Sequence, residues 1–199
     1  MATAIELGEG RRIYIRALQA ADREALAEGF ERLGPQSRYM RFFAPVVRLS
    51  DSQLEYLTDI DHHDHEALVA VDERSGDGVG IARYVKIGER VAEPAVAVAD
   101  DWQHMGVGTL LLDELADRAR TEGINSFTAR VLADNAGALA LLRRIGDAEL
   151  IEQGQEVEVR IELLQSRGAV DPLHRLLRHA AEETLRPSAS LRQHRHEES

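Results

Sequence analysis

The clearest candidates for a binding site in the sequence are Gln103, Gly106, Gly108 and Thr109, in the segment QHMGVGT. An apolar alternating run precedes this segment and an amphipathic pattern follows it, so the sequence predicts a strand, a glycine-containing loop and the N-terminus of a helix. Unpaired backbone N–H groups and the positive end of the helix dipole meet at such a junction. The glycines let the main chain approach a ligand closely. Residues 96–112 therefore predict a diphosphate-binding loop.

Two better-known phosphate loops do not fit this segment. A Walker loop needs Lys followed by Ser or Thr after its last glycine, whereas Gly108 is followed by Thr109 and Leu110. A dinucleotide fingerprint needs a further glycine three residues on, and that position is Leu111. The pattern that remains is Gln-x-x-Gly-x-Gly at the start of a helix.

Composition restricts the class of protein. The chain has 199 residues, no cysteine, a formal net charge of −11 and a pI near 5.2. The acidity argues against nucleic-acid binding, and it either suits a cationic partner such as an amine or only keeps the protein soluble. No apolar run approaches the ~20 residues that span a bilayer, and the N-terminus lacks the order of a signal peptide. We expect a cytoplasmic protein without disulfides, thiol nucleophile or membrane association.

Hydrophobic periodicity and chain-breaking residues predict the elements that position this loop. Strands are expected over residues 12–16, 67–71, 79–87, 91–99, 127–132, 149–151 and 157–163, and helices over residues 20–33, 51–58, 107–121 and 135–146. Together they predict one folded domain over residues 1–165. A helix over residues 166–186 is expected to pack on this domain or to form a homodimer contact, and residues 187–199 are expected to be a disordered tail.

Two polar or aromatic segments leave alternatives open. The segment SRYMRFF, residues 37–43, either lines an acceptor groove or meets coenzyme phosphates, or it is a turn with buried aromatics and solvated arginines, which we favour. The segment DHHDHE, residues 61–66, has enough histidines and acids for a divalent metal. Neighbouring loop residues rarely close a tetrahedral site, so a solvated polar loop is favoured, with contact to the acceptor as a further possibility.

A second motif lies one strand and one helix beyond the loop. Residues 135–146, NAGALALLRRIG, begin with Asn135, have an alanine at Ala138 and end in Gly146. With the Gln-x-x-Gly-x-Gly loop before it, this segment resembles the Asn-x-x-Ala…Gly helix of the GCN5-related N-acetyltransferases (the GNAT superfamily). The resemblance covers residues 11–165. It implies an α/β fold with a mixed, mostly antiparallel twisted sheet that splays at its central strand and carries helices on both faces.

The resemblance also implies a coenzyme, acetyl-CoA as cosubstrate, and assigns residues to it without any metal. The pyrophosphate takes backbone N–H groups from the loop, the acetyl and pantetheine groups meet the preceding strand, and the second motif flanks the pantetheine arm. An arginine at the end of that motif, Arg143 or Arg144, either approaches the 3′-phosphate or is solvated. The residues assigned in this way are Val96, Ala97, Val98, Gln103, His104, Met105, Gly106, Val107, Gly108, Thr109, Asn135, Ala138 and Arg144.

A narrower resemblance is to bacterial protein-lysine acetyltransferases of the Pat type, carried by the segments SRYMRFF, LTDIDHHDHEALVA and AEPAVAVADDWQHMGVGTLLL. It implies that Glu93, in the Ala-Glu-x-Ala pattern, is the general base that deprotonates a lysine ammonium. The alternative is that Glu93 has no catalytic role and lies at a solvent-exposed strand start, which the following Pro94 favours.

The chain departs from the superfamily pattern at two positions. Many members have a tyrosine as general acid where this chain has Leu142, so the thiolate either leaves unassisted or is protonated by water. Asp147 stands where an aromatic residue usually follows the glycine. The expected function is acetyl transfer to a primary amine, with a protein lysine ahead of a polyamine, antibiotic or amino acid. A non-catalytic acetyl-CoA sensor is the third hypothesis.

Overall fold

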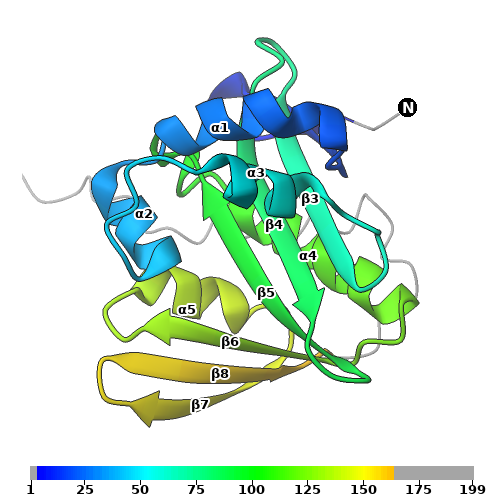
Figure 1. Cartoon of the computed structure of the whole chain (residues 1–199), viewed down its shortest axis with the longest axis vertical. Helices are drawn as coiled ribbons and strands as arrows, with labels where there is room; N and C mark the ends of the chain where they lie inside the picture. The colour runs from blue at the N-terminus through cyan, green and yellow to red at the C-terminus, as the bar shows by residue number, and fades with distance from the viewer. Residues whose placement is uncertain (1–3, 164–199) are drawn as a thin grey trace, which may run out of the picture. The chain divides into compact units, whose positions relative to one another are not determined.

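The computed structural model describes residues 4–163, which form a single sheet with helices on both of its faces (Figure 1). The predicted helix 166–186 and tail 187–199 lie outside the described residues. The elements in chain order are β1 (Ile5–Glu6), β2 (Arg12–Ala17), α1 (Arg23–Glu31), α2 (Pro35–Phe42), α3 (Asp51–Thr58), β3 (His65–Asp72), β4 (Gly78–Lys86), β5 (Val91–Val98), α4 (Val107–Thr121), β6 (Ser126–Leu132), α5 (Ala136–Leu142), β7 (Asp147–Gln153) and β8 (Glu156–Glu162). None of the helices within residues 4–163 is long and apolar enough to cross a membrane.

The sheet is mixed and opens in its middle. Its order is β1-β2-β3-β4-β5-β6-β8-β7, and every neighbouring pair is antiparallel except β5 and β6. Those two strands pair only through Val91↔Ser126 and Ala92↔Phe127, although both continue well beyond that point. Figure 1 shows them diverging from this contact. The predicted α/β fold, with a mostly antiparallel sheet splayed at its central strand, is confirmed.

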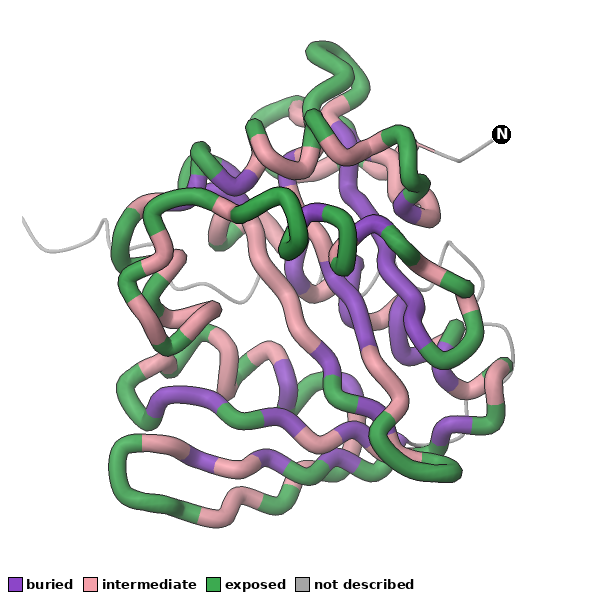
Figure 2. Tube along the Cα trace, in the orientation of Figure 1, coloured by how far each residue is buried: buried purple, intermediate pink, exposed green. Residues whose placement is uncertain are grey.

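The main hydrophobic core lies between the sheet and α4. The predicted apolar stripe of this helix is buried: Leu111, Leu112, Leu115 and Ala119 each have 0% exposure. β3 crosses the same core and is buried along nearly its whole length, as Figure 2 shows. The helices α1, α2 and α3 lie in front of the sheet and α4 behind it (Figure 1). Burial of both sheet faces explains why β3 reads as a continuous apolar run.

β5 uses its two faces differently because successive strand side chains point to opposite sides. Ala92, Val96 and Val98 belong to the main core on the α4 side. Glu93, Ala95 and Ala97 therefore share the opposite face, toward α1, α2 and α3. Their β4 partners on that face are Val85, Arg83 and Ile81, in that order. The central strand thus separates a packed face from a face that carries charged residues.

The segment 37–43 is helical, which corrects the expected turn. α2 begins at Pro35, a residue suited to the first helical position because its missing N–H would have had no helical partner. Tyr39 is 46% exposed and Phe43 is 38% exposed, so these aromatics are not buried as predicted. The helix ends at Phe42, because the next residue, Phe43, has a φ of 56° that terminates the regular backbone.

The helix after Asn135 is shorter than predicted and ends at Leu142 rather than near Gly146. Gly146 lies beside β8, where an added Cβ would meet the backbone oxygen of Glu162 and come within 2.8 Å of Ile161 Cγ2. Gly146 is therefore required by close packing of the chain onto the last strand, and Asp147 begins β7 immediately after it.

We expect Gly146→Ala to destabilise the domain by about 1–3 kcal/mol, because the Cβ clashes with backbone that cannot move aside. Urea unfolding would measure the loss. Gly137→Ala is the matched control in the preceding helix, since a Cβ there meets nothing closer than Asn135 Oδ1 at 3.8 Å. This control should leave stability unchanged or raise it by up to about 1 kcal/mol. Equal stability of both variants would contradict the packing role of Gly146.

Candidate active site

The loop between β5 and α4 presents a series of uncommitted backbone N–H groups. Gly106 has a φ of 88° and caps α4 without any side-chain hydrogen bond. His104 also has a positive φ, of 63°, and its side chain is exposed. The N–H groups of residues 104–109 form no hydrogen bond with another residue in the part of the chain that the structure describes. They converge at the start of a 15-residue helix, as an anion-binding loop requires.

The side chain of Gln103 holds this loop in place. Its amide Nε2 lies 3.1 Å from the carbonyl oxygen of Val98, 3.2 Å from Ser37 Oγ and 3.2 Å from Asp100 Oδ1. Asp100 in turn accepts hydrogen bonds from Ser37 Oγ at 2.7 Å and from the Gly34 N–H at 3.1 Å. The loop is therefore connected to the start of α2, which the sequence did not indicate.

The second motif supplies a capped helix. The Oδ1 of Asn135 accepts a hydrogen bond from the Ala138 N–H at 3.0 Å, so Asn135 is the N-cap of α5. Its amide nitrogen still has donor capacity, since the cap uses only the oxygen. Arg143 and Arg144 follow the last helical residue and are both exposed.

Gly108 lets α5 approach α4 and β5 closely. A Cβ at this position would lie 3.2 Å from Leu141 Cδ1 and 3.6 Å from Val98 Cγ2. Leu142 is only 5% exposed and belongs to the main core. The loop, the start of α4, the helix α5 and the end of β5 thus meet in one region.

Val96, Ala97 and Val98 lie on β5 beyond its last pairing with β6, and all three are half-buried. On that side the edge of β5 has no neighbouring strand, so its main chain can bind a ligand instead. The structure brings this edge together with the loop 103–109 and with α5. Assignment of single residues to coenzyme A stays a prediction.

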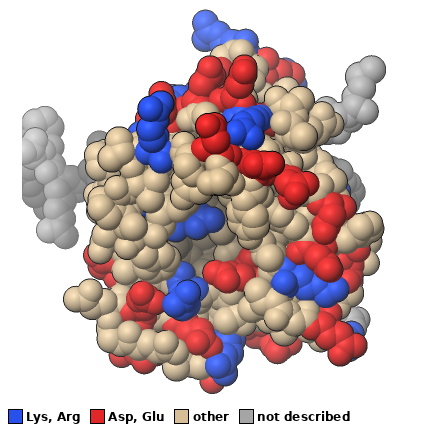
Figure 3. Space-filling model, viewed as in Figure 1, with Lys and Arg blue, Asp and Glu red and all other residues tan. Residues whose placement is uncertain are grey.

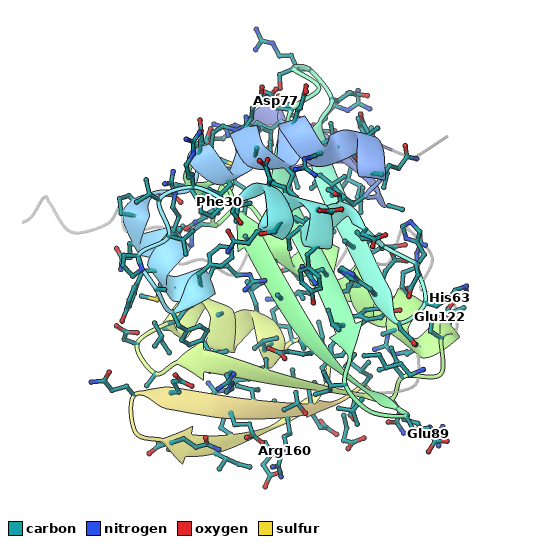
Figure 4. The ribbon with its side chains drawn as sticks, in the orientation of Figure 1. Phe30, His63, Asp77, Glu89, Glu122 and Arg160 are labelled. Atoms are coloured by element: carbon teal, nitrogen blue, oxygen red, sulfur yellow. The ribbon has the colours of Figure 1, made fainter. Side chains whose placement is uncertain are left out.

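A cavity of about 110 Å³ opens on the other face of β5. Its walls come from α1, α2, α3 and from strands β2 to β5, and they are mainly apolar. Phe30 and Phe42 meet edge to face there, with ring centroids 5.5 Å apart. Figure 4 shows Phe30 between α1 and α2. Glu93 is exposed and shares the strand face of two wall residues, Ala95 and Ala97.

Three arginines line this cavity, which the sequence did not reveal. Arg16 forms a two-point hydrogen bond with Asp22, at 2.7 and 2.8 Å, which holds the pKa of the Asp22 carboxyl below its ordinary value. Arg83 projects from β4 and is 7% exposed. Arg41 comes from α2, so the arginines of SRYMRFF are not simply solvated as we expected. A charged residue inside the apolar pattern VGIARYV was the signal for Arg83.

The segment 61–66 is only partly a polar loop, which corrects the prediction. His65 and Glu66 begin β3 and are 9% and 1% exposed. Glu66 Oε1 lies 2.7 Å from His62 Nδ1, and Glu66 Oε2 accepts a hydrogen bond from Arg118 Nη1 at 3.5 Å. Among the described residues, no group of three or more His, Cys, Asp and Glu could hold a metal ion.

His63 makes a separate contact with the end of α4. Its Nδ1 lies 2.9 Å from Glu122 Oε2, and Figure 4 shows these two side chains together. The hydrogen bond with Glu122 raises the pKa of His63. The histidines of this segment therefore make different contacts: His62 contacts Glu66 on β3 itself, whereas His63 connects the loop before β3 to the end of α4.

The sheet splays at its central strand, and a loop with free N–H groups follows that strand. Together these features are typical of the coenzyme-binding acyltransferase fold, which gives the class of the protein. The chain belongs to the acetyltransferase (GNAT) family, whose model matches residues 36–147. It is an N-acetyltransferase of the GNAT type.

Three similar proteins illustrate how this chain relates to the family. An acetyltransferase of Pseudomonas aeruginosa is 34% identical over 145 residues, covering 68% of this chain and 78% of the relative. The acetyltransferase Pat of Mycolicibacterium smegmatis is 31% identical over 144 residues, covering 71% of this chain but only 43% of that protein. The crystal structure of the GNAT domain of S. lividans PAT has a TM-score of 0.75 and 28% identity, with 81% of this chain and 97% of that one covered.

We expect Gly106→Arg to lower acetyl-CoA affinity at least tenfold. The arginine side chain would occupy the loop, and the residue would have to keep a φ of 88°, which glycine adopts readily and other residues do not. Isothermal titration calorimetry would measure it. Gly123→Arg is the control, since it imposes similar strain at a φ of 76° beyond the other end of α4. Unchanged affinity in Gly106→Arg, or an equal loss in both variants, would remove the loop from the binding site.

The Arg16–Asp22 pair should make the domain sensitive to acid. Because the folded-state pKa of Asp22 is lowered, its contribution to stability is present above the unfolded-state pKa of about 3.9 and is lost as pH falls through the folded value. Urea unfolding between pH 5 and pH 2 should therefore show a steeper loss of unfolding free energy in the wild type than in Asp22→Asn. Arg16→Met should flatten the dependence as well, and an unchanged slope in both variants would be inconsistent with the pair.

Proposed function

We propose that the enzyme acetylates a primary amine by direct attack, with Glu93 as general base and a protein lysine as acceptor. The observation that carries this proposal is the position of Glu93 on β5. Its strand face continues into the cavity wall at Ala95 and Ala97, and the same strand leads into the loop with free N–H groups. One strand would thus join a proton acceptor to a phosphate site.

The proposal gives binding roles to three parts of the chain. The N–H groups of residues 104–109 hold the pyrophosphate, with Gly106 shaping the loop and Gln103 fixing it through Ser37 and Asp100. The edge of β5 at Val96, Ala97 and Val98 holds the pantetheine and acetyl groups. Asn135 and Ala138 on α5 flank the arm from the other side, and Arg144 approaches the 3′-phosphate.

Acetyl-CoA supplies an activated thioester, so the protein has to orient the two substrates and transfer protons. Glu93 takes a proton from the acceptor ammonium, directly or through one water, since the amine attacks only when it is neutral. A new N–C bond forms at the acetyl carbon as the C–S bond breaks, and the electron pair stays on sulfur. The acylated nitrogen releases its remaining extra proton to water, and water protonates the departing thiolate, because Leu142 has no proton to donate.

Exposed aromatics near the cavity support a protein acceptor. Tyr39 on α2 and Tyr56 on α3 are 46% and 56% exposed, and both helices contribute to the cavity wall. Exposed aromatic side chains are enriched at protein interfaces, where they contribute much of the binding energy. A small-molecule amine is the second candidate, because the cavity is small and mainly apolar beside the strand.

We expect Glu93→Gln to lower kcat by about 10²- to 10⁴-fold with unchanged acetyl-CoA affinity, since it removes the base and keeps the shape. Coenzyme A release with a panel of proteins and small amines would measure it. Glu89→Gln is the control, because Glu89 is exposed in the β4–β5 turn, away from the cavity in Figure 4.

Two outcomes of this experiment would contradict the proposal. An undiminished rate in Glu93→Gln would exclude Glu93 as the base. Coenzyme A release no faster than background hydrolysis with every acceptor would instead favour a non-catalytic acetyl-CoA sensor.

A further inference from the structure

The three arginines of the cavity differ in how their charge is balanced. Arg16 has its own carboxylate, Asp22, in a two-point hydrogen bond. Arg41 and Arg83 form no ion pair with any residue in the described part of the chain. Their guanidinium carbons lie over aromatic rings instead, Arg41 at 5.0 Å from the centroid of Phe42 and Arg83 at 4.9 Å from that of Tyr56.

The sheet register places Arg83 diagonally opposite Glu93 on the cavity face. Arg83 pairs with Ala95 and Glu93 pairs with Val85, so the two charged residues are offset by one same-face position. Diagonal neighbours across an antiparallel pair are about 7–8 Å apart at Cα, within reach of long side chains. The guanidinium and the carboxylate can therefore contact the same bound molecule.

Arg41 reaches this place from α2. Its pKa is lowered to about 10, first by burial and then by the charge of Arg83, whereas Glu93 acts in the opposite direction. The pKa of Arg83 is also lowered by burial, against the effects of Tyr56 and Glu93. The nearby His65 on β3 cannot balance the arginine charges, because its side chain is never negative. Its own pKa is lowered by burial and by Arg83. Glu93 is thus the carboxylate whose charge acts on both guanidiniums.

A simple alkylammonium would enter this place at an electrostatic cost. It would add a cation beside two guanidiniums that are already partly desolvated, and buried charges are costly unless they are paired. Figure 3 shows basic side chains in the hollow between α2 and the sheet, although the whole chain is acidic. An acceptor that carries its own carboxylate next to the amine would balance the site, because guanidinium and carboxylate match in two-point geometry.

We propose that Arg41 and Arg83 bind a carboxylate of the acceptor and so select amines that have an acidic group beside the reacting nitrogen. This inference rests on the proposed acetyl transfer and names the chemistry of its substrate. A protein can bring the carboxylate as an aspartate or glutamate next to the target lysine, and a free amino acid brings its own α-carboxylate. In both cases the ammonium faces Glu93 while the carboxylate faces the arginines.

The test uses acceptor pairs that differ only in the carboxylate. One pair is a lysine peptide with a neighbouring aspartate and the same peptide with asparagine. The other pair is a set of free amino acids and their amides. We expect kcat/KM to be at least tenfold higher for the carboxylate member of the pair that the enzyme uses, and the preferred pair identifies the source.

The arginines are tested on the same pairs. Arg83→Met and Arg41→Met should each lower kcat/KM for the carboxylate member at least tenfold and bring the preference close to one, with acetyl-CoA affinity unchanged. Arg83→Lys and Arg41→Lys keep the charge and should retain part of the preference. Arg160→Met is the control, because Arg160 lies on β8, away from the cavity in Figure 4, and pairs with Glu158.

The outcomes separate this inference from the function on which it rests. Equal kcat/KM for both members of every pair would overturn the carboxylate preference while acetyl transfer stands. An undiminished preference in both methionine variants would exclude the arginines. Absence of transfer to every acceptor, with acetyl-CoA still bound, would contradict the proposed function itself. Arg41, on a helix in front of the sheet, provides the test should Arg83→Met fail to fold.

Discussion

Pairing between β5 and β6 ends early, and this opening in the sheet shapes the packing on both sides of it. After Ala92 the two strands share no ladder, so the β6-facing edge of β5 has no strand partner. Backbone polar groups need partners when they are removed from water, and a gap in a sheet therefore favours a ligand with polar groups along its length. Pro94, two residues later, has no N–H to donate and suits such an edge. The same gap leaves room for α5 to approach α4 through Gly108.

The central strand also connects two chemically different sides. Its core face packs on α4 through Val96 and Val98, which fixes its position rigidly. Its other face lies toward the cavity, with Glu93 near one end. The hydrogen bonds among Ser37, Asp100 and Gln103 connect the cavity wall at α2 with the loop 103–109. Positions on both sides of the strand are therefore set by one rigid element, as reacting groups require.

Local sequence patterns predicted much of the fold. The helix 107–121 was predicted with the bounds that the structure gives α4, because its apolar stripe and the glycines at its two ends are local signals. Ser50 caps α3 through the N–H of Gln53, a standard N-terminal arrangement. The segments 37–43 and 61–66 were predicted less well. Their mixed polar and aromatic composition has no clear period, and packing of α2 and β3 against the sheet decided their structure.

Local patterns in the chain were enough to predict the family, the order of the elements and the strand–loop–helix at residues 96–109, because each depends on residues that are close together in the chain. The set of side chains that line the cavity could not be predicted in this way. Arg41 and Arg83 are 42 positions apart in the numbering and belong to a helix and a strand. Their common location beside Glu93 follows from the register of β4 on β5 and from the packing of α2. Neither relation is encoded in a local pattern, since each is set by contacts between distant segments.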